Sequence, residues 1–335
     1  MKKIVYTKYG SPDVIEFIET EKPLPRDNQV LVKVHAASVN ILDWYHLTGP
    51  PVIRLTNGTL SKPKKTSLGL DVAGRVEAVG DSITQFQPGD EVFGIAKGSF
   101  ADYVCADEHE LVRKPANVSF EAAAATPVAA VTALQGLHNK GRIQPGQKVL
   151  INGASGGVGT FAVQIAKSFE TIVTAVCSTR NLDIARSMGA DHVIDYTQED
   201  FTTHGQRYDL IFAVNGYNLI FDYRRALHST GIYIAAGGKL AQIIQAVLIG
   251  PMLSKFGSQQ LSFMGIAQIT QKDLSAIGEL LESGKVVPVI DRCYPLEATS
   301  EALQYLGEGH ARGKVIIIMR LDDDSSQGQI TKSGC

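Results

Sequence analysis

Short apolar runs and longer stretches with apolar residues at every third or fourth position alternate from residue 148 onward. The apolar runs predict strands, and the stretches between them, such as 182–188, predict helices. The predicted strands are 148–152, 171–176, 192–195, 209–214 and 231–236. Strands that alternate with helices in this way predict an open parallel sheet with helices on its faces.

The first third of the chain has a different pattern of apolar and polar residues. Residues 1 to about 120 contain short apolar runs separated by turn signals, as in Pro88-Gly89-Asp90, and predict many strands and few helices. The stretch 49–66 is rich in Pro, Lys and Thr and predicts an exposed loop. Ser119 is a candidate cap for a helix over 122–125, and Pro127 opens another that continues to about 138.

The pattern changes again after residue 263. Amphipathic periodicity predicts helices over 272–283 and 298–306, an extended segment over 286–290 lies between them, and 314–319 reads as a last strand. The final residues, 321–335, hold an Asp run with Ser, Gly and Gln and predict a flexible tail.

Composition narrows the class of protein. A chain of 335 residues can form two domains, and 44% hydrophobic with 20% charged residues is typical of a soluble globular protein. A net charge of −2 provides no basic field for nucleic acid. The four cysteines are scattered, which fits a reducing compartment, and the start of the chain has no signal-peptide pattern. We therefore expect a cytoplasmic protein.

One apolar stretch, 240–253, raises the question of membrane binding. Gln242, Gln245 and Pro251 interrupt it, and it is too short to span a bilayer. A helix buried in its domain or at a subunit interface is the favoured interpretation, and a peripheral membrane role is the alternative.

A glycine-rich turn between a predicted strand and a predicted helix is the most informative motif. It replaces the first glycine of the G-x-G-x-x-G dinucleotide pattern by alanine, with an extra glycine just before it. The N–H groups and the partial positive charge of the helix N-terminus suit a pyrophosphate. The predicted cofactor-binding residues of the turn are Gly153, Ala154, Ser155, Gly156, Gly157, Val158 and Gly159.

The end of the second strand of this unit bears on the choice of nucleotide. An NAD site places Asp or Glu there, whereas this strand ends with Ser178, Thr179 and Arg180. Two hydroxyls and a guanidinium suit the 2′-phosphate of NADP(H), because arginine forms charge-assisted bonds to phosphate. Arg180 could equally be a solvated surface charge, and NADP(H) is the favoured cofactor.

Several segments together resemble the medium-chain dehydrogenase/reductase superfamily, and its zinc-free quinone oxidoreductase branch in particular. They are ASVNILD (37–43), GLDVAGRVEAVG (69–80), PGDEVFG (88–94), GADHVIDY (189–196) and HARGKV (310–315), with the glycine turn at the expected spacing. Within this branch the chain is most similar to chloroplast-envelope-type quinone oxidoreductase homologues, and the resemblance covers residues 1 to about 320.

The resemblance implies an α/β protein with a GroES-like, mostly β catalytic domain and a doubly wound, parallel-sheet Rossmann domain. The expected boundaries are 1–122 for the first part of the catalytic domain, 123–265 for the Rossmann domain and 266–320 for the return to the catalytic domain. The family also implies a homodimer.

The departures from zinc-dependent relatives bear on the chemistry. Asn40 stands where those relatives have a zinc-binding cysteine, and Leu70-Asp71 stands where they have His-Glu. The eight histidines show no metal-ligand spacing, so no metal site is predicted. Without a Lewis acid, simple ketone reduction loses its electrophile, whereas a conjugated acceptor delocalises the charge that hydride addition creates. This favours NADPH-dependent reduction of quinones or α,β-unsaturated carbonyls, and an NADPH-binding scaffold or redox sensor with little turnover is the alternative.

The resemblance also places candidate site residues, each with a structural alternative. Asn40 and Tyr45 are the candidate catalytic residues, although Asn40 could only stabilise a loop and Tyr45 could only pack. The sequence does not decide whether Tyr45, His46 or a water donates the proton. Asp43 is interpreted as a structural partner, and Asp71 receives no catalytic role. The further cofactor-binding candidates that the resemblance places are Thr132, Tyr196, Phe263 and Met264. Asn215 is a candidate because it follows the predicted strand 209–214, at the edge of a parallel sheet where cofactors bind.

Overall fold

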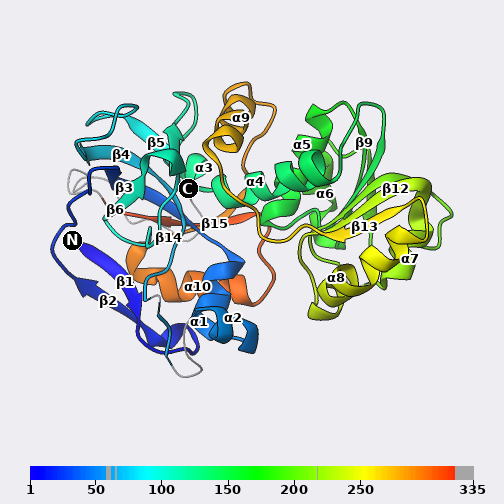
Figure 1. Cartoon of the computed structure of the whole chain (residues 1–335), viewed down its shortest axis with the longest axis horizontal. Coiled ribbons are helices and arrows are strands. Elements are labelled where there is room, and N and C mark those ends of the chain that lie inside the picture. Colours follow the sequence, from blue (N-terminus) through cyan, green and yellow to red (C-terminus); the bar gives the residue numbers. More distant parts are fainter. Residues whose placement is uncertain (58–61, 65, 217, 321–335) are drawn as a thin grey trace. The chain divides into compact units, whose positions relative to one another are not determined.

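The computed structural model describes residues 1–57, 62–64, 66–216 and 218–320 (Figure 1). The chain divides into two compact units. Of the described residues, the β-rich unit contains those in 1–128, 269–282 and 288–320, and the parallel-sheet unit contains those in 129–268 and 283–287. The predicted tail, 321–335, lies outside the described residues.

The domain boundaries differ from the predicted ones at 122 and 265. The helix α3 (Phe120–Ala124) belongs to the β-rich unit because it packs against strands of that unit's sheet, and Ser119 caps it by accepting the N–H of Ala122 at 3.2 Å. The helix α9 (Gln271–Glu282) also belongs to the β-rich unit, and the chain returns briefly to the parallel-sheet unit at 283–287.

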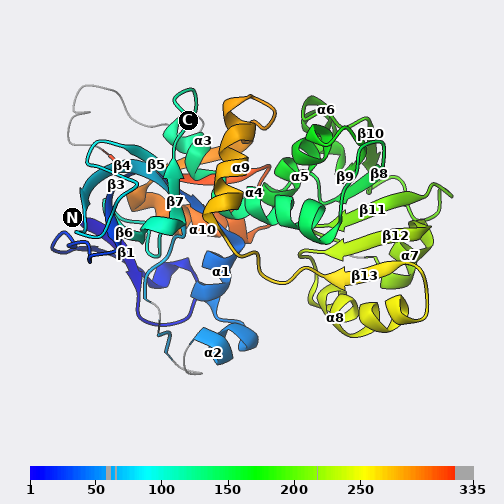
Figure 2. The same ribbon diagram turned by 45° about the horizontal axis from the view of Figure 1, so that its top comes forward.

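The parallel-sheet unit has a six-stranded sheet in the order β10-β9-β8-β11-β12-β13, in which every pairing is parallel (Figure 2). The strands are β8 (Lys148–Asn152), β9 (Ile172–Cys177), β10 (His192–Asp195), β11 (Tyr208–Ala213), β12 (Leu227–Ala235) and β13 (Gln260–Phe263). The helices are α4 (Pro127–Leu134), α5 (Gly157–Ser168), α6 (Leu182–Ser187), α7 (Ile220–Ala226) and α8 (Leu240–Lys255). This confirms the predicted parallel sheet and adds β13 as a sixth strand.

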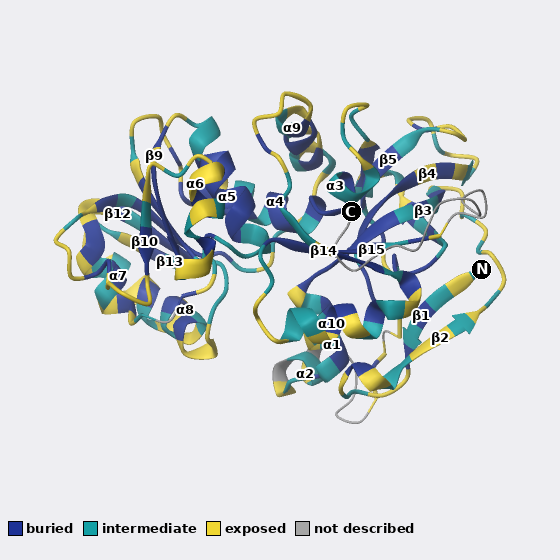
Figure 3. Ribbon diagram, turned by 180° about the vertical axis from the view of Figure 1, so that it is seen from behind, coloured by how far each residue is buried: buried dark blue, intermediate teal, exposed yellow. Residues whose placement is uncertain are grey.

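The burial pattern follows from this layering (Figure 3). The central strand β8 is buried from Val149 to Asn152, because helices cover a doubly wound sheet on both faces. Gly189 follows the end of α6 and has a φ of +91°. Glycine adopts this conformation without steric cost. Among the described residues, no helix combines the length and the apolar character needed to cross a membrane.

The β-rich unit has a seven-stranded sheet in the order β14-β15-β3-β4-β5-β7, with β6 paired to β3, and a two-stranded sheet of β1 and β2. The strands are β1 (Lys2–Tyr6), β2 (Ile15–Glu19), β3 (Gln29–Val39), β4 (Asp71–Val79), β5 (Glu91–Ile95), β6 (Tyr103–Asp107), β7 (Leu111–Arg113), β14 (Ile290–Pro295) and β15 (Lys314–Ile318). The predicted extended segment 286–290 leads into β14, which begins at Ile290.

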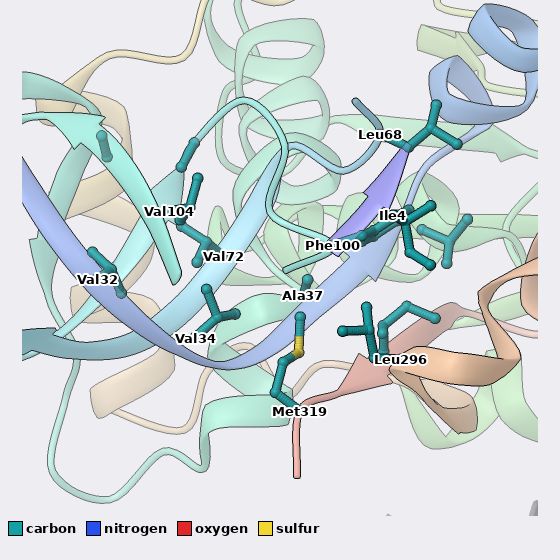
Figure 4. Close-up of a cluster of buried hydrophobic side chains, with 14 of the residues drawn as sticks. Ile4, Val32, Val34, Ala37, Leu68, Val72, Phe100, Val104, Leu296 and Met319 are labelled. Atoms are coloured by element: carbon teal, nitrogen blue, oxygen red, sulfur yellow. The ribbon is translucent and has the colours of Figure 1, made fainter. Parts of the chain in front are cut away.

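The core of this unit brings together side chains from both ends of the chain (Figure 4). Val32, Val72 and Phe100 from the N-terminal part share one buried cluster with Leu296 and Met319 from the C-terminal part. The unit therefore depends on chain segments separated by the whole parallel-sheet unit.

Two helices interrupt the region that was predicted to be strands and loops. The helix α1 (Ile41–Thr48) begins at an Asn40–Asp43 capping box and ends at Gly49, which has a φ of +61°. The helix α2 (Pro51–Asn57) begins with a proline, which suits the first turn of a helix. The predicted loop over 49–66 is therefore wrong for its first part, and 58–61 and 65 lie outside the described residues. The last helix of the unit is α10 (Thr299–Gly307).

Candidate functional site

Most of the predicted cofactor-binding residues lie at one edge of the parallel sheet, next to the carboxyl ends of its strands. Because all strands run in the same direction, the residues that follow β8, β9, β10, β11 and β13 must lie along the same edge. These residues are 153–159, 178–180, Tyr196, Asn215 and Met264, with Phe263 as the last residue of β13. Thr132 lies half-buried on α4.

The glycine turn has the geometry of a tight strand-to-helix connection. Gly153 has a φ of +87°, and an added Cβ there would come within 2.8 Å of the backbone nitrogen of Asn215. A Cβ at Gly159 would overlap the carbonyl oxygen of Gly153, so this glycine allows α5 to pack directly on the turn. Gly156, the residue that precedes α5, has its nearest neighbour for such a Cβ at 3.7 Å. Its surface is open for a ligand to approach the backbone.

The end of β9 carries three polar side chains with different surroundings. Ser178 is half-buried and its hydroxyl accepts the Asn181 amide at 3.1 Å, while Arg180 is exposed. The Thr179 hydroxyl donates to Asp195 at 2.5 Å, and this bond is the largest cause that holds the pKa of that carboxyl below its ordinary value. The hydroxyl proton of Thr179 is thus already used within the protein, which leaves Ser178 and Arg180 as the better candidates to contact a phosphate.

Two further candidates lie beside these elements through their backbones. The N–H of Tyr196 donates to the carbonyl of Cys177 at 3.1 Å, which holds the exposed tyrosine next to the end of β9. The N–H of Asn215 donates to the carbonyl of Asn152 at 3.2 Å, which holds the exposed Asn215 beside the start of the glycine turn. At the sheet edge beyond them, Phe263 is half-buried and Met264 is buried.

A buried polar network lies in the β-rich unit. The ammonium of Lys314 donates to the Asn40 side-chain oxygen at 2.7 Å and lies 3.4 Å from the Asp71 carboxylate. The Asn40 amide donates to the same carboxylate at 2.9 Å. Asp71 and Lys314 are 0% and 3% exposed, so the pair is almost fully removed from water. Asn40 links the two charges.

Strand register explains why these three residues meet. Val315 of β15 lies opposite Val39 of β3, which brings Lys314 to Asn40, and Ser38 of β3 lies opposite Asp71 of β4. The Ser38 hydroxyl donates to Asp71 at 2.5 Å, and the other carboxylate oxygen accepts the Val128 N–H at the start of α4 at 2.9 Å. Asp71, which received no catalytic role from the sequence, is the centre of this network and satisfies four donors.

Asp43 and Tyr45 both lie on α1, in different environments. Tyr45 is 39% exposed, whereas Asp43 is buried and accepts the backbone N–H groups of Asn40 at 2.8 Å and Gly69 at 2.9 Å. Burial raises the pKa of Asp43 to about 6, and the two hydrogen bonds oppose this rise. The structure agrees with a structural role for Asp43, since it joins the start of α1 to the segment that leads into β4.

The raised pKa of Asp43 predicts a pH dependence of stability. Between about pH 4 and pH 6 the folded chain holds a proton on Asp43 that the unfolded chain has lost. The contribution of Asp43 to the free energy of unfolding therefore falls as pH rises through this window. We expect the stability of the wild type relative to Asp43→Asn to fall from about pH 4 to about pH 6 and to level off above about pH 6.

Fluorescence in a urea titration measures this difference. Trp44, the single tryptophan of the chain, lies on α1 next to Asp43 and reports on the β-rich unit. The matched control is Asp81→Asn at an exposed position, which should leave the pH profile of stability unchanged. A constant difference for Asp43→Asn across this pH range would contradict the prediction.

Sequence reasoning missed Lys314, Ser38 and Asp195 as parts of these sites. A lysine that opens an otherwise apolar strand, as in Lys314–Ile318, is the signal that could have identified Lys314. A lysine is almost never fully buried without a partner, so a buried carboxylate could have been expected beside it. Ser38 and Asp195 depend on strand pairing, which the sequence pattern does not provide.

The comparisons with known proteins agree with this architecture. The family model described as "Alcohol dehydrogenase GroES-like domain" matches residues 26–116, and the model described as "Zinc-binding dehydrogenase" matches residues 188–317. A chloroplast envelope quinone oxidoreductase homolog from Arabidopsis thaliana is 32% identical over 333 residues, which cover 95% of this chain and 98% of the relative. The chain belongs to the medium-chain dehydrogenase/reductase family.

Other members of the family extend the comparison. A 2-methylene-furan-3-one reductase from Solanum lycopersicum is 33% identical, covering 95% of this chain and 79% of the relative. The structure of a quinone oxidoreductase from Coxiella burnetii has a TM-score of 0.84 and 31% identity, covering 96% of this chain and 99% of the other. These relatives confirm the GroES-like and Rossmann-like fold, and the chain is an oxidoreductase of the NAD(P)H-dependent type.

Proposed function

We propose that this family member reduces quinones or α,β-unsaturated carbonyls with NADPH and without zinc. The observation that carries the proposal is the Asn40–Asp71–Lys314 network, because the resemblance places zinc ligands of the metal-dependent relatives at the positions of two of its members, Asn40 and Asp71. The names of relatives that act on quinones, furanones and alkenals support the substrate class.

The chemistry of this network does not suit a metal cation. The Asp71 carboxylate is satisfied by Ser38, Asn40, Lys314 and the Val128 N–H, and an ammonium already neutralises it. A zinc site needs about three ligands of cysteine, histidine or carboxylate type, and the Asn40 amide is a poor substitute for a thiolate. Within the described ranges, no group of three His, Cys, Asp or Glu residues is placed to hold a metal ion.

The glycine turn and the end of β9 fit NADP(H). The open surface of Gly156 and the first turn of α5 would hold the pyrophosphate, and Ser178 and Arg180 would hold the 2′-phosphate. The bound nicotinamide supplies the hydride. Tyr45 is the candidate to donate a hydrogen bond or a proton to the substrate oxygen, because its side chain reaches the surface. The buried Asn40 amide would position the start of α1, on which Tyr45 lies.

An acceptor panel tests the proposal directly. Purified protein is mixed with NADPH and, separately, with a set of quinones, enones, simple ketones and aldehydes, and NADPH oxidation is followed. We expect turnover with the quinones or enones that is insensitive to chelators. Turnover of simple alcohols that requires added zinc, with enones and quinones untouched, would overturn it. Binding of NADPH with no turnover would favour the scaffold function.

The cofactor preference has its own prediction at Arg180. Removing one guanidinium that bonds to a phosphate costs about 1.5–3 kcal/mol, so Arg180→Ala should weaken NADPH binding by about 10- to 150-fold. The affinity for NADH should stay the same, because NADH lacks the 2′-phosphate. Fluorescence titration with each nucleotide measures both constants.

Arg186→Ala is the matched control for this measurement. Arg186 is an exposed arginine on α6 whose side chain pairs with Asp183 at 2.9 Å. Arg186→Ala should leave the affinities for NADPH and NADH unchanged. Equal loss of NADH and NADPH affinity in Arg180→Ala would show that Arg180 has no part in choosing the nucleotide.

The cytoplasmic location and the homodimer expected from the sequence also remain predictions.

A further inference from the structure

The helix α8 is largely apolar, yet the fold covers only one side of it. The buried positions Gln242, Ala246 and Gly250 recur at every fourth residue and face the protein. Gly250 allows a close approach to β13, since an added Cβ would lie 2.6 Å from the Leu261 carbonyl oxygen, and the Ser254 hydroxyl accepts the Leu261 N–H at 2.8 Å. This side of α8 is firmly attached to the sheet.

The opposite side of α8 exposes a row of large apolar side chains. Parts of the α8 ribbon carry the colour of exposed residues in Figure 3. The row, which we name the α8 stripe, contains Leu240, Ile244, Val247, Leu248, Met252 and Phe256. Leu248 is 69% and Phe256 is 83% exposed. These positions repeat at three- and four-residue intervals, so they form one continuous face. Of the two favoured interpretations of this segment, burial within the domain does not hold for this face, and burial at a subunit interface stays a prediction.

The apolar surface continues onto α7. The N–H of Ile220 donates to the Gln245 side chain of α8 at 2.9 Å, which places the start of α7 beside the middle of α8. Leu219 and Phe221 on either side of this contact are 56% and 52% exposed. Contiguous apolar patches of this kind mark interaction sites on soluble proteins.

The charges near the stripe are mainly basic. Asp222, next to Phe221, pairs with Arg225 at 2.8 Å, and the sequence from 223 to 268 contains no further Asp or Glu but contains Arg224, Lys239 and Lys255. Lys239 directly precedes α8 and the exposed Lys255 ends it. Arg224 lies at the same end as Lys255, since its guanidinium approaches Gly257. An apolar face bounded by basic residues suits a surface that is apolar inside and negative outside.

We propose that the α8 stripe docks onto the surface of an anionic lipid bilayer. The apolar side chains would enter the boundary between headgroups and acyl chains, and Lys239 and Lys255 would meet the lipid phosphates. A second copy of the chain is the less favoured occupant. A symmetric pairing of two stripes would bring basic ends together with no carboxylate from 223 to 268 to neutralise them.

Vesicle flotation of the full chain tests this inference. We expect binding to vesicles that contain phosphatidylserine, weak binding to phosphatidylcholine alone, and a decrease in binding as salt increases. Leu248→Glu should abolish binding, and Lys255→Ala should weaken it by about fivefold. Leu24→Glu, at a leucine of the β-rich unit that is 85% exposed, is the matched control and should bind as the wild type does.

The other outcomes overturn the proposal. Equal binding to both kinds of vesicle would show that the basic residues have no role. Absence of binding, together with a dimer in sedimentation that Leu248→Glu dissociates, would identify a second copy as the occupant. Circular dichroism confirms that each variant is folded. If Leu248→Glu fails to fold, Lys255→Ala decides. Binding of Lys255→Ala to phosphatidylserine vesicles that is as strong as that of the wild type would then overturn the proposal.

Discussion

Replacing Lys314 by methionine is expected to destabilise the β-rich unit by about 3–5 kcal/mol, because it leaves the buried Asp71 carboxylate without its counter-charge. The methionine keeps most of the apolar stem of the lysine, so the loss comes from the ammonium rather than from a cavity. Ser38, Asn40 and the Val128 N–H still donate to the carboxylate, but none of them carries a charge. Urea unfolding followed by Trp44 fluorescence measures the change.

Two further variants make this measurement specific. Lys22→Met removes the ammonium of the exposed Lys22–Glu77 pair in the same unit, where the side chains are 41% and 36% exposed, and should cost about 0–1 kcal/mol. The double variant Asp71→Asn with Lys314→Met removes both charges and should recover part of the loss. If Lys314→Met is no more destabilising than Lys22→Met, the network is not a stabilising element.

Replacing Gly159 by alanine should damage the parallel-sheet unit and its cofactor site together. The new methyl group would overlap the Gly153 carbonyl oxygen, which is backbone and cannot rotate away. Either α5 or the turn must shift, and overpacking of this kind costs about 1–3 kcal/mol. Since the shift moves the N–H groups that would hold the pyrophosphate, we expect NADPH affinity to fall by about tenfold or more. Thermal unfolding and NADPH fluorescence titration measure the two effects.

Gly156→Ala tests cofactor binding separately from the stability of the fold. Its added methyl group finds its nearest protein atom at 3.7 Å, an ordinary contact distance, so stability should change little. If the pyrophosphate lies over this turn, the methyl group should still weaken NADPH binding. Wild-type NADPH affinity in both Gly156→Ala and Gly159→Ala would exclude the turn as the cofactor site. Trp44 fluorescence should be unchanged in both, because the tryptophan belongs to the other unit.

Local features of the structure were the most predictable. The glycine turn could be located because a strand, four closely spaced glycines and a helix follow one another within one segment. The strands β8 and β10 have the predicted bounds, since their apolar runs end at polar or glycine residues. The helix α1 was missed, because its capping box looks like an ordinary turn sequence.

Features that depend on distant parts of the chain could not be predicted. The Asp71–Lys314 pair requires β3 to pair with both β4 and β15, and no local pattern specifies that register. The side of α8 that is exposed could not be identified for a related reason. The largely apolar segment predicts a helix buried in its domain or at a subunit interface, and only the structure shows which side the domain leaves uncovered.

The β-rich unit is formed by both ends of the chain, and this affects how the chain folds during synthesis. The strand β3 leaves the ribosome early, whereas its partner β15 is among the last segments made. The parallel-sheet unit, nearly continuous in sequence, can fold while β15 is still being made. Until β15 arrives, residues 36–39 of β3 lack their partner on one side and Asp71 lacks its cation. Chaperones and proteases therefore have a window in which to recognise an incomplete chain.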